Sequence, residues 1–174
     1  MNLDQAVNLI HQKKTLFQNT RQWADLGCGT GLFTQALARL LPEGSVIHAV
    51  DTNKSSLQKL PKPDHIQIIP HVLDFEREVW PFHSLDGVLM ANALHYVTDK
   101  RHFIRQIQPY LQQSHLLLII EYERSKPNPW VPYPITYAGL SSLLLELGYQ
   151  VVSKLGERPS IFGRAQMYAA LGQK

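Results

Sequence analysis

Three glycines alternate over five residues directly after a short apolar segment, and this pattern constrains the fold more than any other part of the chain. Residues 22–26 have the length and apolar character of a buried strand, and Gly27, Gly29 and Gly31 follow at once. Glycine adopts positive φ readily and puts no Cβ between the backbone and a neighbour. Apolar residues at helical spacing begin at Phe33. The sequence therefore predicts a strand, a tight turn and a helix, with the turn's backbone open to a bound molecule.

Predicted strands and helices alternate along most of the chain, which indicates an α/β fold with a mostly parallel sheet covered by helices on both faces. The predicted strands are residues 22–26, 45–50, 66–69, 85–91, 115–122, 149–155 and 165–171. The predicted helices are residues 3–10, 33–41, 54–60, 99–111 and 136–147. Pro109 is expected to kink or end the fourth helix, and the last two strands are expected to pair as a hairpin.

Length, charge and cysteine content narrow the class of protein. The 174 residues suit one domain, in which residues 1–21 form an N-terminal helix and lead-in. The net charge is +3 and no basic run stands out, so the charge does not favour nucleic-acid binding. Cys28 is the single cysteine, no secretory signal is visible, and the longest apolar run, residues 116–120, is too short to span a bilayer. We therefore expect a cytoplasmic protein without a membrane segment.

Polar side chains stand at or just after the predicted ends of four strands. They are Asp25, Asp51, Asp74 and Asn92. The carboxyl ends of parallel strands meet at one edge of a sheet, and ligands of such sheets bind beyond that edge, where the strand order reverses. The sequence therefore predicts a binding site at this edge, next to the glycines.

The spacing of the glycines bears on which nucleotide-like ligand binds. A dinucleotide-binding turn needs a further glycine at the position that Leu32 occupies, and a bulky residue there hinders close approach of a pyrophosphate. Asp51 lies 20 residues beyond Gly31, where an acidic side chain can accept from ribose hydroxyls, but this fits dinucleotides and other nucleosides equally. A nucleotide-dependent oxidoreductase is thus an open but less favoured interpretation.

Four segments together resemble the motifs of the class I S-adenosylmethionine-dependent methyltransferases, and they are residues 24–31, 50–53, 73–75 and 85–97. The resemblance implies a Rossmann-like seven-stranded sheet with an antiparallel C-terminal edge hairpin. It also implies S-adenosyl-L-methionine as the cofactor and S-adenosyl-L-homocysteine as its product. The cofactor-binding residues that it implies are Asp25, Leu26, Gly27, Cys28, Gly29, Thr30, Gly31, Asp51, Thr52, Asn53, Leu73, Asp74, Phe75, Ala91 and Asn92.

Charge complementarity agrees with these roles. Asp25 could attract the cofactor's amino group, while backbone N–H groups of the turn could donate to its carboxylate. The resemblance assigns Asp51 to the ribose and Asp74 to the adenine amino group. Asp74 could equally be an ordinary helix cap, since it precedes Phe75 and two charged residues.

The acceptor side of the site rests on fewer residues. His95 is the candidate general base, because it follows the fourth strand near the expected methyl position and histidine is the residue type most suited to proton transfer near neutral pH; it could also simply pack there. Trp130, Tyr133 and Tyr137 lie in or after a proline-rich loop and could stack on an aromatic or cationic acceptor, or anchor the loop. No metal site is expected, since His95 and His102 have no third ligand.

The sequence thus predicts a methyltransferase with a small-molecule acceptor and leaves the oligomeric state open. Methylation of RNA or protein is a variant of this hypothesis. Asn92 is followed by Ala93 and Leu94 rather than by two prolines and an aromatic residue, which disfavours the DNA-amine type of reaction. A non-catalytic partner or sensor that binds S-adenosylmethionine is the alternative from a different class.

Overall fold

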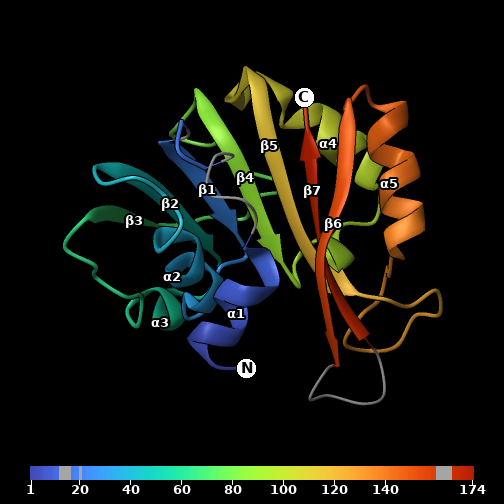
Figure 1. Ribbon diagram of the computed structural model, residues 1–174, viewed down its shortest axis with the longest axis horizontal. Coiled ribbons are helices and arrows are strands. Elements are labelled where there is room, and N and C mark those ends of the chain that lie inside the picture. The colour runs from blue at the N-terminus through green and yellow to red at the C-terminus, as the bar shows by residue number, and fades with distance from the viewer. Residues whose placement is uncertain (12–16, 20, 160–165) are drawn as a thin grey trace.

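A seven-stranded sheet forms the centre of the computed structural model, which describes residues 1–11, 17–19, 21–159 and 166–174 (Figure 1). The strands are β1 (Gln22–Leu26), β2 (Ser45–Asp51), β3 (Ile66–Val72), β4 (Leu85–Ala91), β5 (Leu111–Tyr122), β6 (Val151–Pro159) and β7 (Gln166–Gln173). Their order across the sheet is β3-β2-β1-β4-β5-β7-β6. The first five pair in parallel, and β7 is antiparallel to both β5 and β6. The predicted fold, including the C-terminal edge hairpin, is confirmed.

The strand order places the glycine turn at the point where the direction of winding changes. From β1 the chain moves outward to β2 and β3, then returns to the other side of β1 with β4 and β5. Asp25 on β1 pairs with Ala49 of β2 on one side and with Leu89 of β4 on the other. The end of β1 is therefore central and lies at the position where sheets of this kind bind their ligands.

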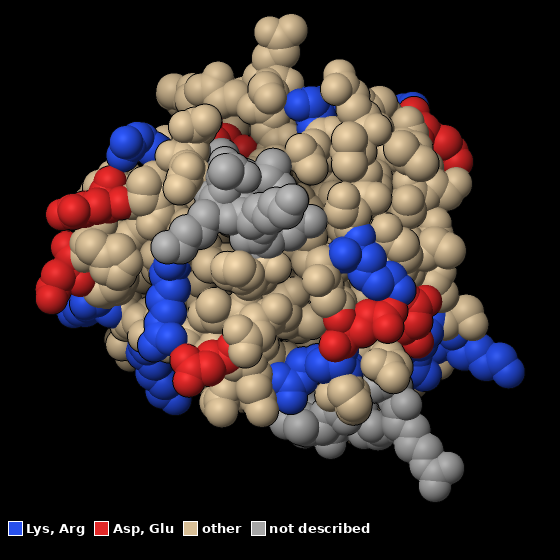
Figure 2. Space-filling view, in the orientation of Figure 1, with Lys and Arg blue, Asp and Glu red and all other residues tan. Residues whose placement is uncertain are grey.

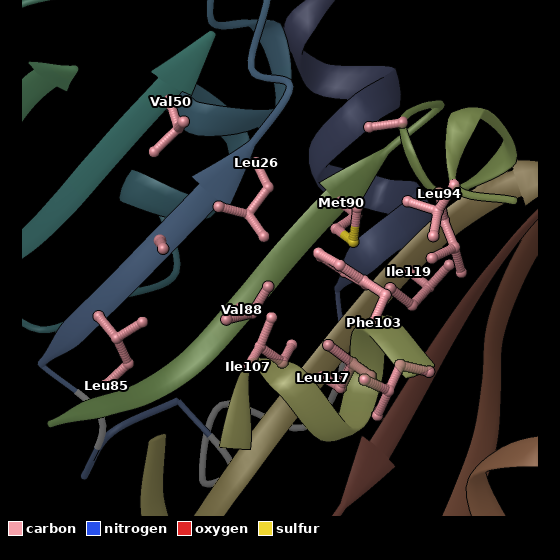
Figure 3. Packing of buried hydrophobic residues seen from close by; sticks show 14 of the residues in the cluster. Leu26, Val50, Leu85, Val88, Met90, Leu94, Phe103, Ile107, Leu117 and Ile119 are labelled. Carbon is pink, nitrogen blue, oxygen red and sulfur yellow. The ribbon is translucent and has the colours of Figure 1, made fainter. Parts of the chain in front are cut away.

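Helices cover both faces of the sheet. They are α1 (Leu3–Ile10), α2 (Leu32–Ala38), α3 (Lys54–Leu57), α4 (Lys100–Gln106) and α5 (Tyr137–Glu146), with 3-10 helices η2 (Leu94–Tyr96) and η3 (Gln108–Tyr110). One core cluster packs α1 and α2 against the sheet, and the other packs α4 and α5 (Figure 1). Because side chains alternate along a strand, Val88 and Met90 join the α4 side while Leu89 joins the α2 side (Figure 3).

Local signals set most element boundaries. Asn2 and Gln5 form a capping box at α1, and Thr136 accepts from the N–H of Gly139 at α5. Helix α4 ends at Gln106, and Pro109 lies in the 3-10 turn that follows, as expected. Strand β3 runs further than predicted, because its ladder with β2 continues through Pro70, which an edge strand tolerates.

Some predicted elements differ from the observed ones in where they begin or end, and some predicted residues lie outside the described ranges. The predicted helix over residues 54–60 is a single turn, and β6 begins two residues later than predicted. Part of the predicted lead-in (residues 12–16 and 20) and Ala165 at the start of a predicted strand lie outside the described residues. None of the described helices is long and apolar enough to cross a membrane.

Candidate functional site

The glycine loop (residues 27–31) leaves the carboxyl end of β1 and is held by hydrogen bonds to β2. The N–H groups of Gly27 and Cys28 both donate to the carbonyl oxygen of Val50, at 2.8 and 3.0 Å. The N–H of the loop's central glycine donates to Oδ2 of Asp51 at 2.8 Å. Positive φ values of 54 to 85° occur at Gly27, Gly29 and Gly31. Hydrogen bonds within the protein therefore fix the conformation of the loop without the help of a ligand.

Internal bonds also use most of the loop's donors. The N–H of Gly31 donates to the carbonyl oxygen of Cys28 at 3.0 Å, so four of the five loop residues donate inside the protein. Most of the loop N–H groups that were expected to donate to a cofactor carboxylate are thus already used within the protein. Thr30, the remaining residue of the loop, is exposed. Burial raises the pKa of the Cys28 thiol, and the neighbouring Asp25 raises it further, which keeps the thiol neutral.

The glycines differ in what surrounds them. A Cβ on Gly27 would lie 2.7 Å from Cβ of Ala93 and 3.7 Å from the ring of Phe75, so this glycine permits close packing of three segments. A Cβ on Gly31 would lie 2.7 Å from the side chain of Leu60. Nothing lies within 4 Å of the corresponding position on Gly29. The centre of the loop therefore faces open space, as a backbone cradle for a ligand requires.

Asp25 is a buried carboxylate with an unused oxygen. Its side chain is 1% exposed, and Oδ2 accepts from the hydroxyl of Thr34 on α2 at 2.6 Å. Oδ1 is buried without a hydrogen-bond partner. Burial raises the pKa of Asp25 to about 7, with a further rise from the charge of Asp51 and a partial offset from the Thr34 hydrogen bond. A cationic donor beside Oδ1 would stabilise the ionised form.

Asp51 connects the loop to the strand ends beside it. Besides the loop N–H on Oδ2, Oδ1 accepts from the N–H of Asn53 at 2.8 Å, and the Asp51 carbonyl accepts from the N–H of Leu73 at 3.2 Å. The Asn53 side chain in turn caps α3. Thr52 between them is exposed. Each carboxylate oxygen of Asp51 keeps a lone pair for a further donor.

The segment after β3 contributes an apolar wall and a turn. Leu73 is buried, and the ring of Phe75 packs edge-on to that of Phe103, with centroids 5.6 Å apart. Asp74 shapes the turn, since Oδ1 accepts from the N–H of Glu76 at 3.0 Å. The residues after Asp74 form a turn rather than a helix, so Asp74 holds a turn and caps no helix, and its side chain is half-buried.

Residues after β4 complete the edge. Ala91 ends the strand, and Asn92 has a φ of 54°, a left-handed conformation that is uncommon for a non-glycine residue. Its N–H donates to the carbonyl oxygen of Ile120 on β5 at 2.8 Å. Its Oδ1 atom is buried and has no hydrogen-bond partner. Leu26, by contrast, points into the α4-side core and does not line the edge (Figure 3).

His95 forms a buried pair with Glu121, a residue that the sequence reasoning missed. The two side chains are 2% and 1% exposed, and Nδ1 of His95 lies 2.7 Å from Oε2 of Glu121. Oε1 of the same carboxylate accepts from the backbone N–H of His95 at 3.0 Å. A carboxylate beside Nδ1 selects the tautomer with its proton there, so Nε2 of the neutral ring is an acceptor. Nε2 is buried and unpartnered.

Unsatisfied polar atoms concentrate at this edge. Within the described residues, four buried side-chain atoms lack a hydrogen-bond partner, and three of them are Asp25 Oδ1, Asn92 Oδ1 and His95 Nε2. Buried polar atoms in proteins are almost always paired, so such a cluster indicates a place where another molecule supplies the partners. With Asp25 ionised and the His95 ring neutral, all three atoms accept hydrogen bonds, so they suit a ligand rich in donors, such as one bearing an ammonium group.

The proline-rich loop is attached to the segment that carries His95. The N–H of Tyr133 donates to the carbonyl oxygen of His95 at 3.0 Å, and Nζ of Lys100 donates to the carbonyl oxygens of Tyr133 and Val97 at 2.7 and 2.9 Å. Trp130 and Tyr133 are 75% and 43% exposed. These two predicted acceptor-side aromatics thus lie on a loop bonded directly to the His95 backbone.

Tyr137 is placed differently from the other two aromatics. It begins α5, its ring packs edge-on to Tyr168 with centroids 5.8 Å apart, and its hydroxyl donates to the carbonyl oxygen of Val152 at 3.3 Å. Its ring is therefore engaged by the protein. In the part of the chain that the structure describes, no three histidine, cysteine or acidic side chains gather as a metal site would need.

Comparison with known proteins agrees with this geometry. A family model described as a methyltransferase domain matches residues 24–114. The curated ubiquinone/menaquinone biosynthesis C-methyltransferase UbiE of Hahella chejuensis (strain KCTC 2396) is 34% identical over 132 residues, which is 70% of this chain and 50% of that protein. The chain thus spans half the length of this relative.

Solved structures share the fold at low identity. The plantazolicin methyltransferase BpumL in complex with SAH is 14% identical, with a TM-score of 0.68 over 99% of this chain and 83% of that one. A SAM-dependent methyltransferase from Methanosarcina mazei is 17% identical, with a TM-score of 0.68 over 92% and 95% of the two chains. Because the family model matches more than half of the residues, the chain belongs to the methyltransferase domain family.

Proposed function

We propose that the protein is an S-adenosylmethionine-dependent methyltransferase that acts on a small-molecule acceptor. The observation that carries the proposal is the set of three unpartnered buried atoms at the strand-end edge from which the glycine loop leaves, together with the open space beside Gly29. S-adenosyl-L-methionine, when bound, supplies an electrophilic methyl group on a sulfonium and leaves as S-adenosyl-L-homocysteine. Its ammonium group matches Asp25 Oδ1 in charge and in hydrogen-bonding role.

The remaining cofactor contacts follow the strand ends. Asp51 has lone pairs left for ribose hydroxyls, while Leu73 and Phe75 offer an apolar wall for adenine and Asp74 an acceptor nearby. Gly29 leaves the room that a ligand against the backbone needs. These residues come from β1, β2 and β3, so one bound molecule would join three neighbouring strand ends.

His95 is the proposed general base, with Glu121 as its positioning residue. Glu121 holds Nδ1 protonated, which leaves Nε2 to accept a proton from the acceptor as it is methylated. The carboxylate then faces an imidazolium, which it stabilises. Alignment of the acceptor with the methyl group supplies much of the remaining catalysis.

The buried pair also favours an enzyme over a binding module. Removing a carboxylate and an imidazole from water is costly, and a module that only binds the cofactor has no use for a free Nε2 at this point. On the face seen in Figure 2, basic and acidic side chains are intermixed, which does not favour a polyanionic acceptor such as RNA. The UbiE relative is named for ubiquinone and menaquinone biosynthesis, which concerns small molecules. The free Cys28 thiol fits the proposed cytoplasmic location.

Calorimetry with S-adenosyl-L-homocysteine tests the proposal, with two glycine variants as a matched pair. Gly29 and Gly44 both have positive φ, and an added Cβ meets nothing closer than 4.0 Å at either position, so both alanine variants bear a similar backbone cost. Only Gly29→Ala fills the cradle, and we expect it to weaken binding about tenfold or more while Gly44→Ala binds normally. Absence of binding to the unmodified protein, or equal effects of the two variants, would refute the proposal.

A further inference from the structure

We infer that the methyl acceptor is an uncharged aromatic molecule that presents a hydroxyl group to Nε2 of His95. The inference rests on the proposed function and adds the class of substrate to it. It is carried by the polarity of the unpartnered atoms, the charges around them, and the aromatic side chains beside His95.

The unpartnered atoms next to β4 are hydrogen-bond acceptors. With Asp25 assigned to the cofactor, the unpartnered atoms on the β4 side are Asn92 Oδ1 and His95 Nε2, and both accept. A molecule that satisfies them must donate. A carboxylate or fully ionised phosphate acceptor has no donor for them, whereas a hydroxyl group has one proton to give and lone pairs left for the methyl group.

The charges around the site disfavour anions. Apart from Asp25, which is assigned to the cofactor, Asp51 and Glu121 stand at the carboxyl ends of β2 and β5. Lys100, five residues after His95, already donates to two backbone carbonyl oxygens. An anionic acceptor would meet more negative than positive groups in a partly desolvated place, where such repulsion is poorly screened.

A cationic amine fits poorly for a chemical reason. An aliphatic ammonium has no lone pair to attack a methyl group until it loses a proton, and an imidazole, the type of base proposed here, is ordinarily a much weaker base than an aliphatic amine. A hydroxyl oxygen has a lone pair from the start. Its proton can move to Nε2 while Glu121 stabilises the resulting charge.

The side chains next to His95 indicate an aromatic ring. The ring of Tyr96 lies 4.4 Å from that of His95 between centroids, yet Tyr96 is 56% exposed. Tyr133 is bonded through its N–H to the His95 backbone, and Trp130 on the same loop is 75% exposed. Tyr96 and Tyr133 thus lie beside the buried base, and Trp130 adds an exposed ring on the same loop, so these side chains offer faces on which a planar acceptor can stack.

A set of four naphthalene probes tests the inference on protein saturated with S-adenosyl-L-homocysteine. The probes share one ring system and are 2-naphthol, 2-fluoronaphthalene, 2-naphthoate and 2-naphthylmethylammonium. We expect 2-naphthol to bind about tenfold tighter than each of the others in calorimetry or NMR titration, because it alone is an uncharged donor. Equal binding of all four, a preference for a charged probe, or no binding of any probe overturns the inference.

Variants connect the preference to the residues. His95→Phe should abolish the preference for 2-naphthol, whereas His102→Phe, the same change at an exposed position of α4, should keep it. Should His95→Phe not fold, Trp130→Ala provides the second test at a position 75% exposed. It should weaken all four probes about threefold or more, while Val79→Ala, at a position 83% exposed, should not. Unchanged binding by Trp130→Ala counts against the aromatic acceptor.

The two proposals fail in different ways. Loss of S-adenosyl-L-homocysteine binding by the unmodified protein refutes the methyltransferase function and the acceptor class together. Normal binding of that molecule without a preference for 2-naphthol refutes the acceptor class alone.

Discussion

Replacement of Asp25 by asparagine should make the free energy of unfolding less dependent on pH and should weaken cofactor affinity. The pKa of Asp25 is about 7 in the folded protein against an ordinary 3.8, so the folded state holds this proton more tightly than the unfolded chain. Stability from that proton is complete below about pH 4 and is lost as the pH rises through 7. Asparagine has the same shape, can still accept from Thr34, and carries no titrating group.

The magnitude follows from the two pKa values. Between about pH 5 and about pH 8.5, the shift from 3.8 to about 7 removes about 3 kcal/mol from the free energy of unfolding. Asp25→Asn has no titrating group at this position and does not lose this free energy as the pH rises. The difference in free energy of unfolding, variant minus unmodified protein, should therefore rise by about 3 kcal/mol from about pH 5 to about pH 8.5. The amide nitrogen of the asparagine takes the place of Oδ1 and has no hydrogen-bond partner there. This unpaired buried group lowers the free energy of unfolding by about 1–3 kcal/mol at every pH.

Urea denaturation at the two pH values measures the stability change, and calorimetry measures the affinity. The variant should bind S-adenosyl-L-homocysteine about 10- to 100-fold more weakly, because it loses a charge-assisted hydrogen bond to the ammonium group. Asp64→Asn, at an exposed site, serves as the control and should change neither quantity. A stability of Asp25→Asn, relative to the unmodified protein, that does not rise between about pH 5 and about pH 8.5, or full affinity in the variant, would refute the reasoning.

Three further predictions concern packing and titration. Gly27→Ala should lower the free energy of unfolding by about 2–4 kcal/mol, since it combines a left-handed backbone with a 2.7 Å approach to Cβ of Ala93; a cost below about 1 kcal/mol in urea denaturation contradicts this. Leu144→Ala, at a fully buried position, should cost about 2–5 kcal/mol in the same assay without weakening S-adenosyl-L-homocysteine. Burial and the adjacent His71 lower the pKa of His48 to about 4, so stability falls as the pH drops from about 6.5 toward 4, and NMR should show a neutral His48 ring at about pH 5.5.

The sequence supplied the fold because its signals are local and repeated. Strands, turns and caps each have a short-range signature, and the chain order of such elements restricts a parallel sheet to few arrangements. The ends of strands were less predictable. Strand β3 reaches Val72 because its neighbour β2 reaches Asp51, and that pairing is a property of two segments rather than of one.

The site was predicted where one residue at a strand end suffices, and missed where a pair is needed. Asp25, Asp51 and Asn92 follow from position alone, whereas the separation of 26 positions between His95 and Glu121 hides their contact. A signal existed in Glu121 itself, a single carboxylate inside a strand that is otherwise apolar from Leu116 onward. The internal use of the loop's N–H groups depends on the register between β1 and β2, which no local pattern specifies.

The hydrogen bonds that hold residues 27–31 have a thermodynamic consequence for any ligand. Fixing the backbone of one residue costs about 1–2 kcal/mol of conformational entropy, and here the fold itself bears that cost through Val50 and Asp51. Binding at the loop should therefore order little additional chain. Its heat-capacity change should match the apolar surface that the ligand itself buries, without the larger value that coupled folding would add.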